Sequence, residues 1–588
     1  MKKVIYIFQK LFQEAPISVS ITITYYVFSA AVPAITTILY VNIFDSIINR
    51  NANSNENIWN GIIAFLGLKL LYYLWNYLYS ALVNTGIFEK GSIYFRKSIC
   101  EKVTKLSLIE LEKADVLDEK KRAENAVEED TLCSVFYQLL EVSSAAFSTM
   151  LIAIVLLKYH WILAVASIST VLPYLVIKVI RGRVHVKVRN MQVKTRRREQ
   201  YYWKLLTEKT SVKELRVLDC EQYIADKWRK SKIQERTALL KEEKRDAEWL
   251  LFCDGIKVIG YFGSLFAAVV LVRYNLIELS MFGGMVMALY NMQSSMKSFL
   301  EATGEIPELL SLSENYFKFM LLPEEPIGKI SYLYDKNECE RDTGKWEINT
   351  KALYFSYPGS RKMILTNINI NIKSGEHVAI VGENGSGKTT LAKLLVGIFP
   401  VKSGIVEWNH YNVENVIREE WYRHVSIISQ NFVKYYLTLR ENVCLSDIEN
   451  LRNNEHIEET LKKANFESSV GYDEILGTEF GGKDLSIGQW QKLAIARAIF
   501  RTFDFIVMDE PTSALDAITE KIILEEFLEA MEGKTAVLIS HRMGICPKMD
   551  RIIVMKNGKI EEVGRHSELL AKQGEYARLY SLQAQWYE

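Results

Sequence analysis

The sequence predicts a polytopic membrane domain built of α-helices, followed by an α/β domain. Six long apolar stretches occupy the first half, and each is long enough to cross a bilayer, which takes a helix of about 20 residues. In the second half, an apolar strand at residues 377–381 leads through a glycine-rich turn into a helix-like run. At 588 residues the chain is too long for one hydrophobic core, so at least two domains are expected.

The composition excludes several functional classes. The net charge of +1 offers no basic field, which argues against a nucleic-acid partner. With 49% hydrophobic residues, the chain is not intrinsically disordered. The seven cysteines are scattered and show no metal-ligand spacing, so we expect reduced thiols in or facing a cytosol.

The N-terminus superficially resembles a signal peptide, because two lysines precede a short apolar run. Polar residues soon interrupt that run, and no small-residue cleavage site follows. We therefore expect residues 1–14 to form an amphipathic helix on the cytoplasmic membrane face. No peptidase domain precedes residue 15, so cleavage of a leader peptide by this chain is not expected.

Six segments are candidate membrane-spanning helices, and Pro33 and Pro173 lie inside two of them. Membrane helices tolerate proline where neighbouring helices satisfy the freed backbone groups. The segments are Ile17–Ile43, Ile58–Val83, Leu139–Leu157, Ile162–Ile180, Leu250–Val272 and Leu279–Phe299.

The loops between these segments predict the orientation of the chain. Those after the first, third and fifth segments are short, whereas those after the second and fourth are long and charged. Residues 181–198 are rich in arginine and lysine and contain no acid. By the positive-inside rule, the long loops and both termini are cytoplasmic, as expected for a multi-pass protein of the cell (plasma) membrane.

The long loops, Asn84–Gln138 and Arg181–Glu248, contain no proline and have apolar residues at helical spacing. We expect the membrane helices to continue into the cytosol and to turn back near Glu112–Asp118 and Val212–Glu221. The fold class is therefore an α-helical polytopic membrane domain with six transmembrane helices and long cytoplasmic extensions, followed by an α/β P-loop ATPase domain, as the motifs below indicate.

One charge inside a predicted membrane segment stands out. Lys69 is flanked by Tyr72, Tyr73, Asn76 and Tyr77. Charged residues at such depth are rare and often functional, although snorkelling or a structural ion pair would also account for Lys69.

A polar stretch beginning Pro323-Glu324-Glu325-Pro326 separates the two halves. We expect a transmembrane domain at residues 1–322, a linker at 323–344 and a nucleotide-binding domain at 345–588.

The glycine-rich turn has the spacing of a phosphate-binding P-loop, with strand and helix in their required places. Its backbone N–H groups and the following helix N-terminus would hold an anion. Lys388 would reach the terminal phosphates, and the Thr389 hydroxyl would bind Mg²⁺. The residues expected to contact the nucleotide here are Gly382, Asn384, Gly385, Ser386, Gly387, Lys388, Thr389 and Thr390.

A second apolar run, residues 505–508, ends in the acids Asp509 and Glu510. The first acid suits a hold on Mg²⁺, and the second suits a general base that polarises the attacking water.

Ser486, Gly488 and Gln489 open a predicted helix, where hydroxyl and N–H groups can donate to an anion. Together with the two preceding motifs, this run resembles the signature of the ATP-binding cassette (ABC) transporters, Leu-Ser-Gly-Gly-Gln. Ile487 departs from that pattern, and we expect it to weaken function at most.

The resemblance implies further roles, with ATP and Mg²⁺ as cofactors. Tyr357 matches the aromatic residue that stacks on adenine. Gln430 matches a glutamine that senses Mg²⁺ and the membrane domain, and Asp516 belongs to the D-loop. His541 matches the switch histidine that contacts the γ-phosphate and takes part in hydrolysis.

The resemblance covers the whole chain and implies an exporter-type half-transporter. In that family two chains pair head to tail, so that the P-loop of one faces the residue equivalent to Ser486 in the other. A second half-transporter is therefore the expected partner, identical or different, together with the lipid bilayer and a transported substrate; no nucleic acid is expected.

Several functions stay open. The sequence favours ATP-driven export by alternating access, with a peptide natural product as cargo, because residues 106–130 look closer to peptide exporters than to many lipid and multidrug exporters. A multidrug or lipid exporter of the same fold is the alternative, as is an ATP-gated channel or non-transporting membrane sensor. An ATPase acting on nucleic acid or ribosomes is disfavoured by the six apolar segments, and a GTPase by the lack of a guanine-binding Asn-Lys-x-Asp element.

Overall fold

A computed structural model gives the fold of the chain in two compact units, which are described separately. The helical unit comprises Met1–Thr104 and Asp118–Leu322, and the sheet unit comprises Lys105–Leu117 and Pro323–Glu588. The structure describes residues 2–48, 54–169, 193–274, 276–326, 328, 347–467, 469–511, 523, 526, 528–529 and 531–584.

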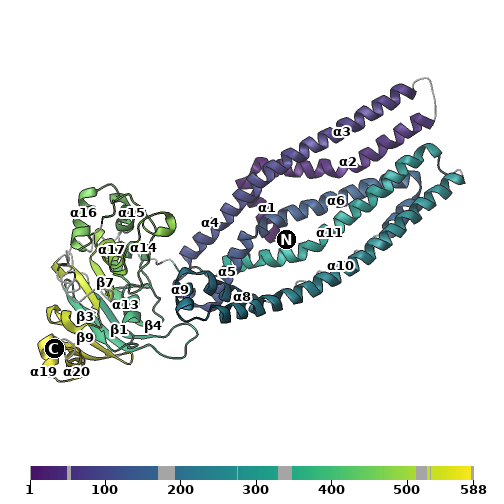
Figure 1. Cartoon of the computed structure of the whole chain (residues 1–588). Coiled ribbons are helices and arrows are strands. Elements are labelled where there is room, and N and C mark those ends of the chain that lie inside the picture. Colours follow the sequence, from purple (N-terminus) through teal and green to yellow (C-terminus); the bar gives the residue numbers. More distant parts are fainter. Residues whose placement is uncertain are drawn as a thin grey trace. The chain divides into compact units, whose positions relative to one another are not determined.

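Long α-helices make up the helical unit (Figure 1). Residues 161–169 are helical as well. The helices are α1 (Lys2–Glu14), α2 (Pro16–Ile48), α3 (Ser54–Val83), α4 (Lys90–Lys105), α5 (Ala114–Glu128), α6 (Thr131–Tyr159), α8 (Val193–Thr207), α9 (Lys209–Val217), α10 (Glu221–Arg273) and α11 (Phe282–Met320), with the short π-helix η1 (Asn84–Glu89) and the 3₁₀ turn η3 (Leu279–Met281).

Four helical runs in the described part of the chain are long and apolar enough to cross a membrane. They are Pro16–Ile48, Asn55–Lys105, Thr131–Tyr159 and Glu221–Arg273, and they contain the first, second, third and fifth predicted segments. The fourth segment is helical up to residue 169, and its remainder lies outside the described residues. The sixth falls on η3 and α11, and it contains the polar residues Asn291, Gln293 and Lys297.

The polar groups of α11 have partners within the helical unit. The Asn291 Nδ2 donates to the Pro33 carbonyl at 3.2 Å and to the Thr37 Oγ1 at 3.3 Å. Ser148 and Ser295 join α6 to α11 through a hydroxyl contact of 3.0 Å. Such mutual satisfaction is what an apolar environment requires of polar side chains.

The predicted helical extensions are present. α3, η1 and α4 form a helical run from residue 54 to residue 105, and α10 alone has 53 residues. At a rise of about 1.5 Å per residue, α10 is about 80 Å long, more than twice the hydrocarbon thickness of a bilayer. The start of the second predicted extension, residues 181–192, lies outside the described residues.

The turns of these extensions lie close to their predicted positions. The second turn contains α9 and ends where α10 begins at Glu221. The first turn comes slightly earlier than predicted, between the end of α4 at Lys105 and the start of α5 at Ala114, and contains η2 (Glu110–Glu112). The predicted N-terminal helix is α1, which buries Ile7 and Leu11.

The sheet unit contains two sheets (Figure 1). An antiparallel sheet has the order β2-β1-β4-β5, formed by β1 (Ile348–Phe355), β2 (Leu365–Ile372), β4 (Ser403–Trp408) and β5 (Tyr411–Asn412). A second sheet has the order β10-β9-β3-β8-β7-β6, formed by β3 (His377–Gly382), β6 (Val425–Ile428), β7 (Phe505–Asp509), β8 (Thr535–Ile539), β9 (Arg551–Lys556) and β10 (Lys559–Gly564).

The second sheet is parallel except for its edge strand, β10. The turn between β9 and β10 contains Asn557 and Gly558, both at positive φ, which is the usual chemistry of a tight hairpin. Alternate residues of β3 belong to different hydrophobic clusters, Val378 to one and Ala379 to the other. The sheet is therefore covered on both faces, as parallel sheets usually are.

Helices of the sheet unit pack around this parallel sheet. They are α13 (Lys388–Leu395), α14 (Arg418–Trp421), α15 (Leu439–Cys444), α16 (Asn454–Lys463), α17 (Ile487–Phe500), α19 (His566–Ala571) and α20 (Glu575–Ala584), with the 3₁₀ helices η4 (Ile448–Asn450), η5 (Thr478–Phe480) and η6 (Met543–Lys548).

One segment from the first half of the sequence belongs to the sheet unit. Within Lys105–Leu117, Ile109 is only 2% exposed and joins the core cluster of the antiparallel sheet. The Lys105 carbonyl accepts a hydrogen bond of 2.8 Å from the Glu325 N–H. Most of the predicted linker, from residue 329 to residue 344, lies outside the described residues.

Candidate nucleotide-binding and hydrolysis site

The P-loop lies at the carboxyl end of β3, in the centre of the parallel sheet, the usual place for ligands in such sheets. Gly382, Gly385 and Gly387 all have positive φ, so each adopts a conformation that favours glycine. A Cβ on Gly382 would lie 2.1 Å from the Met555 carbonyl oxygen. The glycines therefore let the loop turn tightly against β9 before α13 begins.

Two side chains inside the loop suit an anionic ligand. Ser386 is 3% exposed, and its Oγ has no hydrogen-bond partner within the described part of the chain. The Lys388 Nζ donates to the carbonyls of Gly382 and Glu383, each at 2.9 Å. Burial lowers the Lys388 pKa, against the opposing influence of Glu510 and Asp509. A bound phosphate would give the lysine and the orphaned hydroxyl partners of the right charge.

Thr389 and Asp509 meet at the place expected for Mg²⁺. The Thr389 Oγ1 donates to the Asp509 Oδ1 at 3.2 Å. Asp509 ends the fully buried strand β7, and burial raises its pKa despite the hydrogen bond from Thr389. Among the described residues no cluster of three or more His, Cys, Asp or Glu could hold a metal. A hydroxyl and a carboxylate still fit Mg²⁺, which usually takes one or two protein oxygens and completes its shell with phosphate and water.

Glu510 is held by two of the predicted site residues. Its Oε2 accepts from the Gln430 Nε2 at 2.9 Å, and its Oε1 lies 2.5 Å from the His541 Nε2. Glu510 also has a φ of 51°, a left-handed conformation that costs a non-glycine residue on the order of 1–3 kcal/mol. The chain thus aims this carboxylate into the site at some cost in backbone strain.

His541 is neutral at physiological pH. Its pKa is lowered by burial first and by the Lys388 ammonium second, and Glu510 opposes both effects. A neutral ring with its proton on Nε2 is the form that donates to the Glu510 carboxylate. The resemblance implies that His541 contacts the γ-phosphate, and the structure places its ring against Glu510.

Tyr357 lies beside the first turn of α13. Its hydroxyl lies 3.2 Å from the Thr390 Oγ1. Its ring makes edge-on contacts with Phe355 and Phe399, at centroid distances of 5.3 and 5.8 Å. The predicted adenine-stacking residue is thus next to the P-loop helix.

The signature residues form a separate group at the start of α17. The Ser486 Oγ accepts from the Gln489 N–H at 3.2 Å, and the Gln489 Oε1 accepts from the Ser486 N–H at 3.0 Å, which completes a capping box. The Ile487 side chain is 61% exposed, and Gly488 beside it is half-buried. In the described part of the chain the hydrogen bonds of Ser486 and Gln489 stay within this cap and its neighbour Glu467.

Two further residues are predicted to be functional. Asp516 lies outside the described residues. Lys69 belongs to the helical unit, where its Nζ lies 5.9 Å from the centre of the Phe65 ring. Of its predicted neighbours, Asn76 accepts a hydrogen bond of 2.7 Å from the Tyr25 hydroxyl, whereas Tyr77 is 79% exposed.

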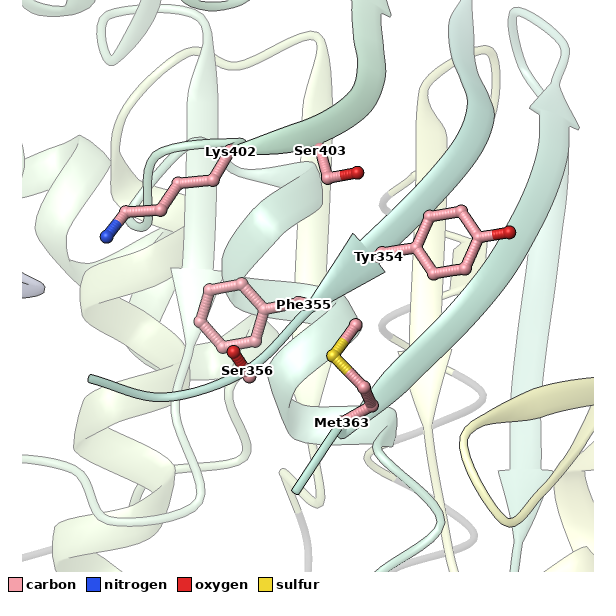
Figure 2. Close-up of a pocket in the computed structure, with 6 residues that line it drawn as sticks. All are labelled: Tyr354, Phe355, Ser356, Met363, Lys402 and Ser403. Atoms are coloured by element: carbon pink, nitrogen blue, oxygen red, sulfur yellow. The ribbon is translucent and has the colours of Figure 1, made fainter. Parts of the chain in front are cut away.

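Two cavities of the sheet unit are lined by residues next to Tyr357 in sequence or by the P-loop itself. The first, of about 300 Å³, contains no P-loop residue. Figure 2 shows the Phe355 ring and the Met363 side chain in it, with Tyr354 pointing to the opposite side of the strand. The second, of about 250 Å³, lies at the P-loop itself and is lined by Gly382, Glu383, Asn384, Ser540, His541, Met543, Leu579 and Gln583.

The second cavity brings in residues that the sequence did not single out. Glu383 pairs with Arg578 of α20 at 2.5 Å, and Gln583 of the same helix contacts the loop that carries His541. Neither Arg578 nor Gln583 belongs to a recognisable motif, and both are far from the P-loop in sequence. Only the folded chain could reveal them.

Comparison with known proteins agrees with this geometry. The ABC transporter family matches residues 365–513. The nisin transport ATP-binding protein of Lactococcus lactis subsp. lactis is 27% identical over 94% of this chain and 92% of its own length. The subtilin transport ATP-binding protein of Bacillus subtilis is 28% identical over 80% of this chain and 76% of its own.

Two further similarities concern other exporters. An ATP-dependent lipid A-core flippase of Vibrio cholerae is 32% identical over 50% of each chain. The solved structure of a bacterial Atm1-family ABC exporter with ATP bound has the same fold, with a TM-score of 0.78 at 17% identity over 96% of this chain and 98% of that one.

The fold and the site therefore define an ATPase joined to a helical membrane domain. The match to the ABC transporter family and the similarity to exporters support an exporter-type half-transporter, with one ATP-binding cassette that couples ATP hydrolysis to transport. The predicted family and fold class are confirmed.

Proposed function

We propose that this half-transporter uses ATP to export a peptide natural product across the cell membrane by alternating access. The observation that carries the proposal is the extent of the similarity. The nisin and subtilin transport proteins align with 94% and 80% of this chain, whereas the lipid A-core flippase of Vibrio cholerae aligns with 50%. Cargo is recognised mainly outside the ATPase domain, so similarity along the whole chain bears on cargo more directly than similarity over half of it.

The site residues have distinct roles in the proposed hydrolysis. Lys388, Ser386 and the N–H groups of the P-loop hold the phosphates, and Tyr357 stacks on the adenine after leaving Thr390. Thr389 and Asp509 hold Mg²⁺, which when bound neutralises charge on the transferred phosphate. Glu510 accepts the proton of the attacking water, and Gln430 and His541 orient its carboxylate.

A second half-transporter completes the site in this proposal. Ser486, Gly488 and Gln489 present the N-terminus of α17 and its free N–H groups to the nucleotide held by the partner's P-loop. Asp516 acts at the same dimer interface. The proposal puts the basic extensions in the cytoplasm by the positive-inside rule, together with both termini and the ATPase domain.

Export of lipid or drugs is the second candidate. It is favoured by the similarity of this chain to the lipid A-core flippases and to a multidrug resistance-like protein of Buchnera aphidicola. The latter is 37% identical over 42% of this chain.

ATPase stimulation separates the two candidates. The purified protein in lipid nanodiscs would be given nisin or subtilin in one series and lipid A in another. The proposal predicts that the peptides raise ATP turnover several-fold and that lipid A does not. Stimulation by lipid A alone would replace peptide export by lipid transport.

A further inference from the structure

The C-terminal helix α20 is anchored firmly in the sheet unit. Tyr576 is fully buried, and Leu579 and Tyr580 pack against the same core cluster. The Glu562 carboxylate of β10 accepts from the N–H groups of Glu575 and Tyr576 at 2.9 and 3.0 Å, which caps the start of the helix with a negative charge. One face of α20 is therefore held at a defined position against the ATPase fold.

The same face ends at the loop that carries His541. Positions 576, 579, 580 and 583 share one side of a helix by their spacing. The Gln583 Oε1 accepts from the Met543 N–H at 2.8 Å, and its Nε2 donates to the His541 carbonyl. A single amide side chain thus joins two backbone groups on either side of Arg542.

The loop has other contacts as well, since the Ser540 N–H donates to the Ile380 carbonyl at 3.4 Å and Met543 is buried in the core. Within it, the Ser540 Oγ accepts from the Arg542 N–H at 2.9 Å and donates to the Arg542 carbonyl at 3.0 Å. These two bonds of the Ser540 hydroxyl shape the loop internally. Gln583 supplies the tie to α20.

The neighbouring side of α20 reaches the P-loop. Arg578 pairs with Glu383 at 2.5 Å and with Glu575 at 2.6 Å, and Lys556 lies 3.1 Å from Glu575. α20 therefore contacts the two loops that, together with Leu579 and Gln583, surround the cavity of about 250 Å³.

We infer that Gln583 is a positioning residue for ATP hydrolysis, which sets the His541 imidazole against Glu510 by clamping the backbone of its loop. The inference rests on the role proposed for His541. It assigns to the C-terminal helix a part in the chemistry, although no atom of that helix need touch the nucleotide.

The test compares variants of the full-length protein in nanodiscs, with MgATP as the probe. Gln583→Ala removes both hydrogen bonds. Gln583→Glu keeps an acceptor for the Met543 N–H but sets a carboxylate against the His541 carbonyl. Leu582→Ala is the matched control, because Leu582 is the adjacent residue and is 47% exposed. Turnover, KM and melting temperature are measured for each variant.

Misplacing a catalytic group by about 1 Å can cost on the order of 100-fold in rate. We expect both Gln583 variants to lose at least about 10-fold in kcat, with KM within about 2-fold and an unchanged melting temperature, because the P-loop contacts remain. Leu582→Ala should match the wild type. A kcat equal to that of the control, or a loss explained by a lower melting temperature, would overturn the inference.

A double variant separates this inference from the proposed role of His541. If Gln583 acts through His541, adding Gln583→Ala to His541→Ala should change the residual turnover by less than about 2-fold. A further loss equal to that seen in the wild-type background would overturn the inference. Full activity of His541→Ala alone would instead contradict the role of His541, and that result is distinguishable from failure of the Gln583 clamp.

Discussion

At the scale of single residues, the hydrolysis site contains the buried, oppositely charged groups Lys388 and Asp509. Lys388 has a lowered pKa and Asp509 a raised one, in both cases because burial disfavours the charged form. Each opposes the shift of the other, so the pair is poised for a ligand that brings its own charge. MgATP supplies negative phosphates to the lysine and a cation to the aspartate.

The first prediction concerns the proposed general base. Glu510→Gln should still bind ATP but should lose about 10²–10⁴-fold in turnover, since an amide cannot accept the proton of water. ATP binding and steady-state hydrolysis by the purified protein measure the two effects. Glu449→Gln, at an exposed position, is the control. Near-normal turnover of Glu510→Gln would contradict the assignment.

The second prediction concerns His541. Its folded pKa lies below its ordinary value of 6.5, so the neutral ring persists until the pH falls through that lowered pKa. The stability that this shift contributes is present above pH 6.5 and is lost as the pH falls from 6.5 toward the folded pKa.

NMR of ¹³C-histidine protein without nucleotide should give a titration midpoint for His541 below 6.5. The His541→Gln variant assigns the signal. A midpoint at or above 6.5 would mean that the ring is hydrated or that its pair with Glu510 dominates.

At the scale of elements, helices α15 and α17 begin with the same kind of N-terminal cap. Ser486 caps α17 and Thr438 caps α15, each with a complete capping box. Only the first belongs to the signature. The two helices therefore offer a matched pair in which the structural cost of losing a cap is separated from a role in ATP hydrolysis.

Replacing either cap by alanine should cost about 1 kcal/mol of stability. Ser486→Ala should in addition lower ATP turnover at least about 10-fold, because the N-terminus of α17 loses a donor aimed at the partner's nucleotide. Thr438→Ala should not. Melting temperature and turnover of both variants provide the comparison, and equal turnover in the two would show that Ser486 is only a cap.

Local motifs could be predicted from the sequence because strand, turn and helix follow each other directly around the P-loop. The sequence predicts both Thr389 and Asp509 at Mg²⁺, and the two lie in contact, whereas it does not predict the contact of Gln430 with Glu510. The contacts of Gln583 and the burial of Ile109 in the sheet unit could not be predicted, because both depend on segments that are distant in sequence. An apolar residue at helical spacing does not reveal which core it joins.

At the scale of the whole molecule, an ATP-binding cassette follows a helical unit that has lysines inside its predicted membrane segments. Lys257 of α10 lies 2.9 Å from Asp254, which makes it a structural pair. In the described part of the chain, the Lys69 Nζ of α3 lies 5.9 Å from the centre of the Phe65 ring. A lysine beside an aromatic ring can hold an anionic or polar group of the cargo.

Lys69→Met keeps the length of the side chain and removes its charge. We expect folding and basal ATP turnover to persist, whereas peptide stimulation falls several-fold. Lys257→Met is the contrasting variant, since it strands Asp254 and should lower the yield of folded protein. If Lys69→Met behaves like Lys257→Met, the lysine is structural; if stimulation is unchanged, the cargo lies elsewhere.

The most direct test of the central claim is solute movement against a gradient. Inside-out proteoliposomes that expose the ATPase domain would receive labelled nisin and MgATP, with Glu510→Gln protein as the inactive control. The account predicts that peptide accumulates inside the vesicles above its external concentration only with the active protein and ATP. ATP hydrolysis without such accumulation, or with peptide only equilibrating across the membrane, would contradict ATP-driven peptide export.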